Sequence, residues 1–145
     1  MPKFDIKRIS AIKGSQIFYQ LTIDDKPNYD GCVSEEDRNE RKTGQLDKYE
    51  KKLEKNYKKD LRMIYAYMDL VANNQPVSGN KYHELTDRPK NDLIKDFEFK
   101  HGDLRVYAFK FSNGKIFALG GYKNNQTSDI KKLRSLKNQY FDSLK

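Results

Sequence analysis

The chain has 145 residues, of which 34% are charged and 36% hydrophobic, and ten Tyr and eight Phe supply large side chains. This length suits one domain, residues 1–145, with a single core, and the aromatic content argues against a chain that is disordered throughout. Cys32 is the only cysteine. An intramolecular disulfide and a thiolate metal cage are therefore excluded.

Lys and Arg number 29 against 21 Asp and Glu, which gives a formal net charge of +8. This excess favours polyanions, nucleic acid above all, because each cation that contacts a phosphate releases a condensed counterion. A lysine-rich solvated surface is the alternative, and it stays open. No segment approaches the ~18 apolar residues of a membrane helix, and no secretory leader opens the chain. We therefore expect a cytoplasmic protein.

The first 44 residues divide into two parts. Residues 1–30 are rich in Ile, Phe and Tyr on both sides of Lys13-Gly14-Ser15, which predicts a hairpin of two strands. Residues 24–44 contain several Pro and Gly and no apolar periodicity, a pattern typical of a loop or an exposed helical turn.

Residues 45–74 have a helical pattern, because Leu, Tyr, Ile and Met recur at steps of three and four. We predict one long helix here, with an apolar stripe that faces a core. The opposite side carries many lysines with acidic neighbours within helical reach, which we interpret as a solvated face. These lysines are Lys48, Lys51, Lys52, Lys55, Lys58 and Lys59.

Residues 96–124 read as a three-stranded meander, and residues 128–144 as an amphipathic helix. Asn113-Gly114 at the centre of the second turn is a strong hairpin signal, and it pairs Arg105 with Tyr122. The first turn, around Gly102, puts Arg105 opposite Glu98 or Lys100.

This register sorts the meander into two faces. One face is almost wholly apolar and needs the long helix as cover. The other is mixed, and its end near Arg105 can stay open to a ligand, with Gly120 and Gly121 leaving room for a ligand backbone. A cross-strand ion pair of Arg105 with Glu98, without any function, explains the same charges equally well. The mixed face holds Glu98, Lys100, Arg105, Tyr107, Gly120 and Tyr122, and the apolar face holds Phe97, Phe99, Leu104, Val106, Ala108, Phe117 and Leu119.

The segment from Lys81 to Leu144 resembles the RelE/HigB/ParE superfamily of toxins from toxin–antitoxin systems, most closely its HigB-like, phage-derived branch. The resemblance rests on KYHEL, on DFEFKHGDLRVYAFKFSNGKIFALGGYKNN and on the closing helix. It implies an α+β fold in which helices pack on one side of a small antiparallel sheet. It also implies a ribosome-dependent endoribonuclease that cleaves mRNA with the other side and is bound by a cognate antitoxin.

The resemblance implies a catalytic set of four residues. It aligns Glu98 and Lys100 with the Glu and Arg of the family's first strand motif, Arg105 with the Arg of the second, and Tyr122 with the aromatic residue of the third. The residues that it implies for RNA binding are Lys123, Tyr107 and Lys100. The chain departs from the family pattern at Gly120, Asn124 and Asn125, where relatives often have His and paired lysines.

Cleavage of RNA needs a base for the 2′-OH, cations for the phosphorane and a donor for the leaving oxygen. Arg105 is the best cation, because its planar fork holds two phosphate oxygens. The base is Glu98 or a tyrosine whose pKa is lowered by nearby cations. His101 is the only histidine expected near this face, and His83 is expected to be a turn or surface residue. Neither has a ligand partner in sequence, so we expect no metal and no cofactor.

Two alternatives follow from the departures. The chain can be a non-catalytic relative that binds nucleic acid or inhibits a target such as gyrase. It can also be a basic interaction module whose sheet only receives an acidic antitoxin segment.

Overall fold

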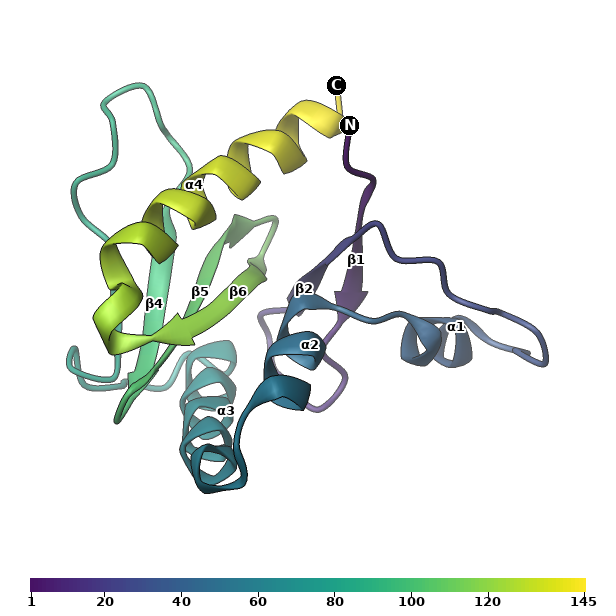
Figure 1. The fold of residues 1–145 in the computed structure, drawn as a ribbon, viewed down its shortest axis with the longest axis horizontal. Helices are drawn as coiled ribbons and strands as arrows, with labels where there is room; N and C mark the ends of the chain where they lie inside the picture. The colour runs from purple at the N-terminus through teal and green to yellow at the C-terminus, as the bar shows by residue number, and fades with distance from the viewer.

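A computed structural model describes residues 1–145. One six-stranded sheet forms the centre of the molecule (Figure 1). The strands are β1 (Phe4–Arg8), β2 (Phe18–Ile23), β3 (Tyr82–Glu84), β4 (Asp96–His101), β5 (Leu104–Phe111) and β6 (Gly114–Tyr122). They lie in the order β1-β2-β6-β5-β4-β3. All neighbours are antiparallel except β2 and β6, which are parallel. The predicted α+β fold is confirmed, with a mixed sheet.

Helices cover both faces of this sheet. α2 and α3 pack on one face, and α4 crosses the other (Figure 1). The helices are α1 (Glu35–Arg41), α2 (Gln45–Lys52), α3 (Lys58–Ala72) and α4 (Gln126–Ser143), with single 3-10 turns η1 (Lys55–Tyr57) and η2 (Lys123–Asn125). None of the helices has the length and apolar character needed to cross a membrane.

The predicted single helix over residues 45–74 is wrong, because the chain leaves the helical conformation at Leu53, where ψ is 137°. Leu46 and Leu53 are both buried, so the break lets α2 lie against β2 and β6 while α3 lies against β4. Two short helices therefore cover more of the twisted sheet than one straight helix would.

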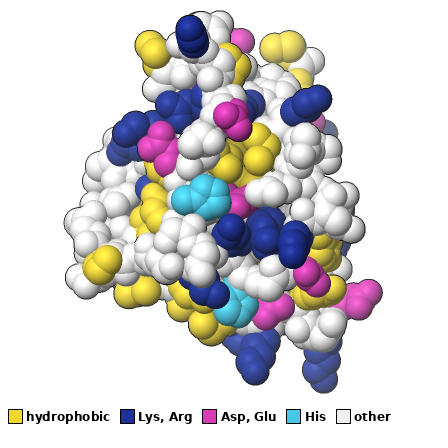
Figure 2. Space-filling model, turned by 90° about the vertical axis from the view of Figure 1, so that its left-hand side faces the viewer, with side chains coloured by type: hydrophobic (Ala, Val, Ile, Leu, Met, Phe, Trp, Pro, Cys, Tyr) yellow, Lys and Arg dark blue, Asp and Glu magenta, His cyan; other side chains and the backbone are white.

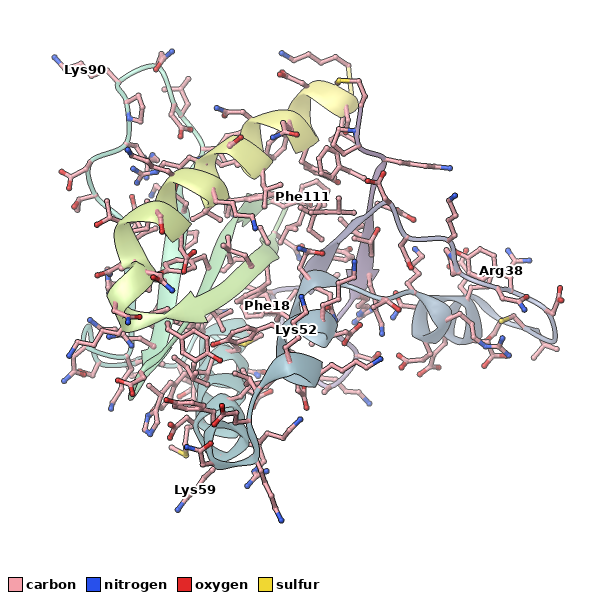
Figure 3. The ribbon with its side chains drawn as sticks, viewed as in Figure 1. Phe18, Arg38, Lys52, Lys59, Lys90 and Phe111 are labelled. Carbon is pink, nitrogen blue, oxygen red and sulfur yellow. The ribbon has the colours of Figure 1, made fainter.

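The break also changes the lysine-rich side of this segment. Most of the lysines are exposed, as expected for a solvated face, but none of them forms an ion pair with its acidic neighbours. Lys58 instead donates to the carbonyl of Glu50 at 3.0 Å. Lys59 extends from α3 into solvent, away from the sheet (Figure 3). The lysines of this segment thus stand among acidic residues without forming ion pairs with them.

The sheet separates two hydrophobic clusters. Phe18 belongs to the cluster under α2 and α3, and Phe111 packs against the cluster under α4 (Figure 3). The first cluster is centred on Phe18, Leu61, Ile64, Met68, Phe99, Leu104, Val106 and Phe117. The second contains Leu21, Tyr107, Phe109, Ile116, Ala118, Leu119, Leu133, Leu136 and Tyr140. The amphipathic helix predicted at residues 128–144 is thus confirmed as α4.

The N-terminal hairpin is confirmed as β1 and β2, and the parallel pairing of β2 with β6 makes it part of the main sheet. The predicted loop or helical turn over residues 24–44 contains α1, which buries no residue. The strand β3 was not expected, because the segment before the meander is polar.

The second turn of the meander lies one residue earlier than predicted. Phe111 pairs with Gly114, so Ser112 and Asn113 form the turn and Ser112 has a φ of 52°. Gly114 is needed within β6 instead, because a Cβ there would overlap the carbonyl of Ile17 on the neighbouring parallel segment. In the first turn Arg105 pairs with Lys100, one of the two predicted partners.

A bulge in β6 further changes the faces of the meander. Tyr107 pairs with Leu119 and Ala108 with Phe117, so Ala118 has no partner on β5. An extra residue reverses the side on which every later side chain points. Arg105 therefore pairs with Gly121, and the predicted pairing of Arg105 with Tyr122 is wrong.

Buried charges fasten α4 to β4. Lys137 has no exposed side-chain surface, and its Nζ lies 2.6 Å from Oδ2 of Asp92 and 3.0 Å from Oδ2 of Asp96. Arg134 bonds Asp96 as well, with its Nε 3.0 Å from Oδ2. Burial alone would raise the pKa of Asp92, but hydrogen bonds from Lys137 and from the N–H of Ile94 hold this pKa below its usual value. The network satisfies every charge that it buries.

Lys115 is buried without an acidic partner. It is 4% exposed, and its Nζ lies 4.2 Å from the ring centroid of Phe97 and 3.3 Å from Oε1 of Gln16. Burial, with a smaller repulsion from Lys110, lowers the pKa of Lys115 to about 8. The aromatic contact offsets part of the cost of the buried charge.

Replacement of this lysine should stabilise the fold at neutral pH. We predict that Lys115→Met raises the free energy of unfolding by about 1 kcal/mol or more at pH 7, because Met fills similar volume without a buried charge. The gain should shrink as the pH rises from the folded pKa of about 8 to the ordinary value of 10.5. Over this range Lys115 of the natural chain loses its proton in the folded state, and with it the cost of burying a charge, whereas Met has no such cost at any pH. Urea unfolding at pH 7 and about pH 10 measures both, with Lys52→Met as an exposed control. A gain that does not change with pH would contradict this account.

Candidate active site

The mixed face of the meander lies under the first turn of α4. Glu98 and Tyr107 have no exposed surface, and Arg105 is 8% exposed. Nε2 of Gln126, the first residue of α4, donates to Oε2 of Glu98 at 2.6 Å. The prediction that this end of the face stays open to a ligand is therefore wrong for these three residues.

The room expected at Gly120 and Gly121 is occupied by the protein itself. A Cβ on Gly120 would overlap the ring of Tyr49, and a Cβ on Gly121 would overlap the carboxylate of Asp129. The hydroxyl of Tyr49 also donates to the carbonyl of Gly121 at 2.7 Å. These glycines allow α2 and α4 to approach β6 from opposite sides, and they do not admit a ligand backbone.

Tyr122 lies on the opposite side of the sheet from Arg105, because of the bulge. Its ring packs edge-to-face against Tyr57, at a centroid distance of 5.6 Å, and against Tyr49 at 6.4 Å. Tyr122 and the exposed Lys123 line a separate hollow at the end of β6. The structure thus brings Glu98, Lys100, Arg105 and Tyr107 together and separates Tyr122 from them.

Arg105 holds the first turn of the meander. Its Nη1 donates to the carbonyls of Gly102 and Leu104, at 2.7 and 2.8 Å, and its buried Nε has no hydrogen-bond partner. Lys100, directly opposite on β4, is partly exposed and makes no side-chain hydrogen bond or ion pair. Of the two cations, Lys100 is therefore the one that can reach a phosphate without rearrangement.

A histidine joins this group from β3. His83 pairs with Glu98 across β3 and β4, and its Nε2 lies 3.5 Å from Oε1 of Glu98. The His83 side chain is 35% exposed, whereas the Glu98 side chain is fully buried. A buried carboxylate beside an accessible imidazole is the arrangement that orients a histidine for proton transfer. The distance is longer than a hydrogen bond.

Neither tyrosine suits the role of base that the sequence suggested. Burial raises the pKa of Tyr107, and the charge of Glu98 raises it further. Burial also raises the pKa of Tyr122, with a smaller contribution from Tyr57. Both shifts are opposite to the lowering that was expected, so His83 is the better candidate for the base.

His101 points to the other face of the sheet. Its Nδ1 lies 2.8 Å from the hydroxyl of Tyr67 on α3, and its Nε2 lies 3.8 Å from Oδ1 of Asp60. It therefore does not belong to the group around Glu98. The chain contains no group of three His, Cys, Asp or Glu side chains that could hold a metal ion.

Four buried polar atoms without hydrogen-bond partners lie along the seam between the sheet and the first turn of α4. They are Oε1 of Glu98, Nε of Arg105, the hydroxyl of Tyr107 and Oδ2 of Asp129. Burial raises the pKa of Asp129. Unsatisfied buried groups cost stability, so this seam is costly to form.

We define the edge site as His83, Glu98, Lys100 and Arg105. It lies on β3, β4 and β5, where the first turn of α4 covers Glu98 and leaves His83 and Lys100 partly exposed. Figure 2 shows both histidines of the chain at the surface on this side of the molecule, with Lys and Arg side chains gathered beside them. A histidine beside a carboxylate can supply a base, and two cations can supply charge stabilisation, for cleavage of a phosphodiester.

His83 is the member that the sequence did not assign. A strand of three residues leaves almost no periodicity to detect, and the histidine has no partner close in sequence. The one available signal was the alternation of Tyr82, His83 and Glu84 beside an aromatic strand, which places His83 and Glu98 on the same side once the strands pair.

Comparison with models of protein families, with curated proteins and with solved structures finds no match to this chain.

The seam around Asp129 should be sensitive to small additions of volume. We predict that Gly121→Ala lowers the free energy of unfolding by about 1–3 kcal/mol, because its methyl group displaces the Asp129 carboxylate and with it the first turn of α4. Gly79→Ala is the matched control, since nothing lies within 4 Å of the added methyl group. Urea unfolding of both variants measures the effect. Equal stability of the two variants would contradict the close approach of Asp129.

Proposed function

We propose that the protein cleaves RNA at the edge site, as an endoribonuclease. The observation that supports this most strongly is the pairing of the accessible His83 with the buried Glu98, beside Lys100 and Arg105. The net charge of +8 favours association with RNA, because basic proteins release counterions when they bind phosphates. The lysine patch on α2 and α3 supplies further cations without acidic partners.

The reaction follows from the four side chains. His83 takes the proton of a ribose 2′-OH, while Glu98 orients the imidazole and stabilises the charge that forms on it. The 2′-oxygen attacks phosphorus and the bond to the 5′-oxygen breaks, while a water molecule gives a proton to the leaving oxygen and takes the proton that His83 holds. Lys100 contacts the phosphorane, and Arg105 adds positive potential from beneath it. The products carry a 2′,3′-cyclic phosphate and a 5′-hydroxyl.

The sequence suggested Arg105 as the main catalytic cation, but in the structure its side chain also holds the first turn of the meander. Its hydrogen bonds to the carbonyls of Gly102 and Leu104 make it part of the turn, so its removal would disturb the position of Lys100 as well. Loss of activity in Arg105→Ala therefore would not separate a catalytic role from a structural one. His83, which is partly exposed and makes no side-chain hydrogen bond, is the residue that tests the chemistry.

The biological setting proposed here is that of a toxin whose target is mRNA on the ribosome and whose partner is an antitoxin. This part rests on the resemblance of residues 81–144 to the RelE/HigB/ParE superfamily. An apolar hollow of about 510 Å³ beside α4 supports the proposal of such a partner. It is lined by Leu93, Ile94, Phe111 and Phe141 and flanked by Lys95 and Lys110. An acidic amphipathic segment would complement it in both charge and hydrophobicity.

A second candidate function is binding of nucleic acid without cleavage. The burial of Arg105 favours it, because the strongest cation of the site already uses Nη1 for two carbonyls. In that case the purified protein would bind RNA with an affinity that falls steeply with salt, and RNA would stay intact.

Substitution of His83 should separate these two functions. We predict that expression of the natural chain alone arrests growth and cuts mRNA. His83→Gln should cleave at least about 100-fold more slowly, since a general base contributes about 10²–10⁴ in rate. Growth curves together with mapping of mRNA 5′ ends measure both effects.

His101→Gln is the matched control, because it changes the only other histidine and leaves the edge site intact. Thermal unfolding of both variants checks that they are folded. If His83→Gln arrested growth and produced the same cut mRNA ends as the natural chain, the proposed chemistry would be contradicted. Arrest by the natural chain without any cut transcript would favour the second candidate.

A further inference from the structure

A hollow of about 570 Å³ lies at the end of β6, next to the edge site. Its lining consists of Tyr57, Asp103, Tyr122, Lys123, Asn124 and Asn125. The N–H of Lys123 donates to the carbonyl of Asp103 at 2.8 Å, so the first turn of the meander and η2 form its two fixed walls. The volume lies in the range of sites for small ligands.

The polar side chains of this hollow have no partners within the molecule. The carboxylate of Asp103, the ammonium group of Lys123 and the amides of Asn124 and Asn125 are all exposed and make no hydrogen bond or ion pair. Donors and acceptors therefore stand side by side at one concave place, where a ligand that offers the complementary pattern can bind several of them at once.

Aromatic rings form the remaining wall. Tyr122 is partly exposed, and its edge-to-face contacts with Tyr49 and Tyr57 fix the orientation of its ring. Single-stranded RNA is recognised in this way, by bases that stack on aromatic side chains and form hydrogen bonds along their edges.

The hollow and Arg105 of the edge site lie at the same end of β5 and β6. Asp103 lies two residues before Arg105, and Tyr122 directly follows Gly121, the partner of Arg105 on β6. Tyr122 points to the face opposite Arg105, so an RNA strand whose phosphate lies at Lys100 has to pass around this end of the sheet to place a base in the hollow.

We infer that the hollow binds a guanine base of the RNA substrate, an inference that rests on the proposed function. The N1–H and N2–H groups of guanine match the two oxygens of Asp103. Its O6 and N7 acceptors match the donors of Lys123 and the two Asn side chains. Adenine has no pair of adjacent donors on this edge, so a carboxylate discriminates between the two purines.

Binding of mononucleotides tests this inference apart from cleavage. We expect GMP to bind about tenfold or more tightly than AMP, since a good bidentate pair discriminates by about 1–3 kcal/mol. The preference should be lost in Asp103→Asn and kept in Asp69→Asn, an exposed acidic residue of α3 with no side-chain bond. Amide chemical shifts of Lys123 to Asn125 in the natural chain report where the nucleotide binds.

Mapping of cleavage sites completes the test. Asp103→Asn should lose the preference for guanine next to the cut by slowing cleavage at guanine sites, whereas His83→Gln loses the rate at every sequence. Equal binding of GMP and AMP, or a guanine preference that survives Asp103→Asn, would overturn the inference even if RNA is cleaved. A GMP preference in a protein that does not cleave RNA would instead support the hollow and reject the endoribonuclease.

Discussion

The position of the candidate site depends on one buried ionic interaction, that of Asp96 with Lys137 and Arg134. It fixes α4 against β4, and this places Gln126, at the start of α4, on the carboxylate of Glu98. Arg134 also binds the carbonyls of Thr86 and Asp87, which anchors the chain just after β3. Buried charges without partners are strongly destabilising, so few other arrangements of this helix are open to the sequence.

The same constraint explains why the polar side of the meander is a seam and not an open cleft. α4 covers the apolar far end of the sheet with Tyr140 and Phe141, and its first turn also covers Glu98 and Tyr107. Buried polar atoms there are left without partners, a cost that the fold bears next to the edge site. The accessible polar side chains are consequently confined to the edge, where β3 adds His83 beside the fixed carboxylate of Glu98.

Much of the fold followed from local patterns, whereas the details of the site depended on contacts between distant segments. The hairpin, the meander and the C-terminal helix were predictable because their periodicity and turns are local. The pairing of Arg105 with Gly121 was not, because it arises from a bulge at Ala118 and from the approach of Ile17 to Gly114. The resemblance aligned Glu98 and Lys100 with one strand motif, but His83, on a strand of three residues, was not assigned to the site.

The central claim is that His83 and Glu98 act as one unit in RNA cleavage. A double-mutant cycle tests it most directly, with cleavage of a defined mRNA measured on ribosomes for the natural chain, His83→Gln, Glu98→Gln and the double variant. The account predicts that each single change lowers the rate by about 100-fold or more and that the double variant is no slower than either. Full activity of His83→Gln, or losses that multiply in the double variant, would contradict it.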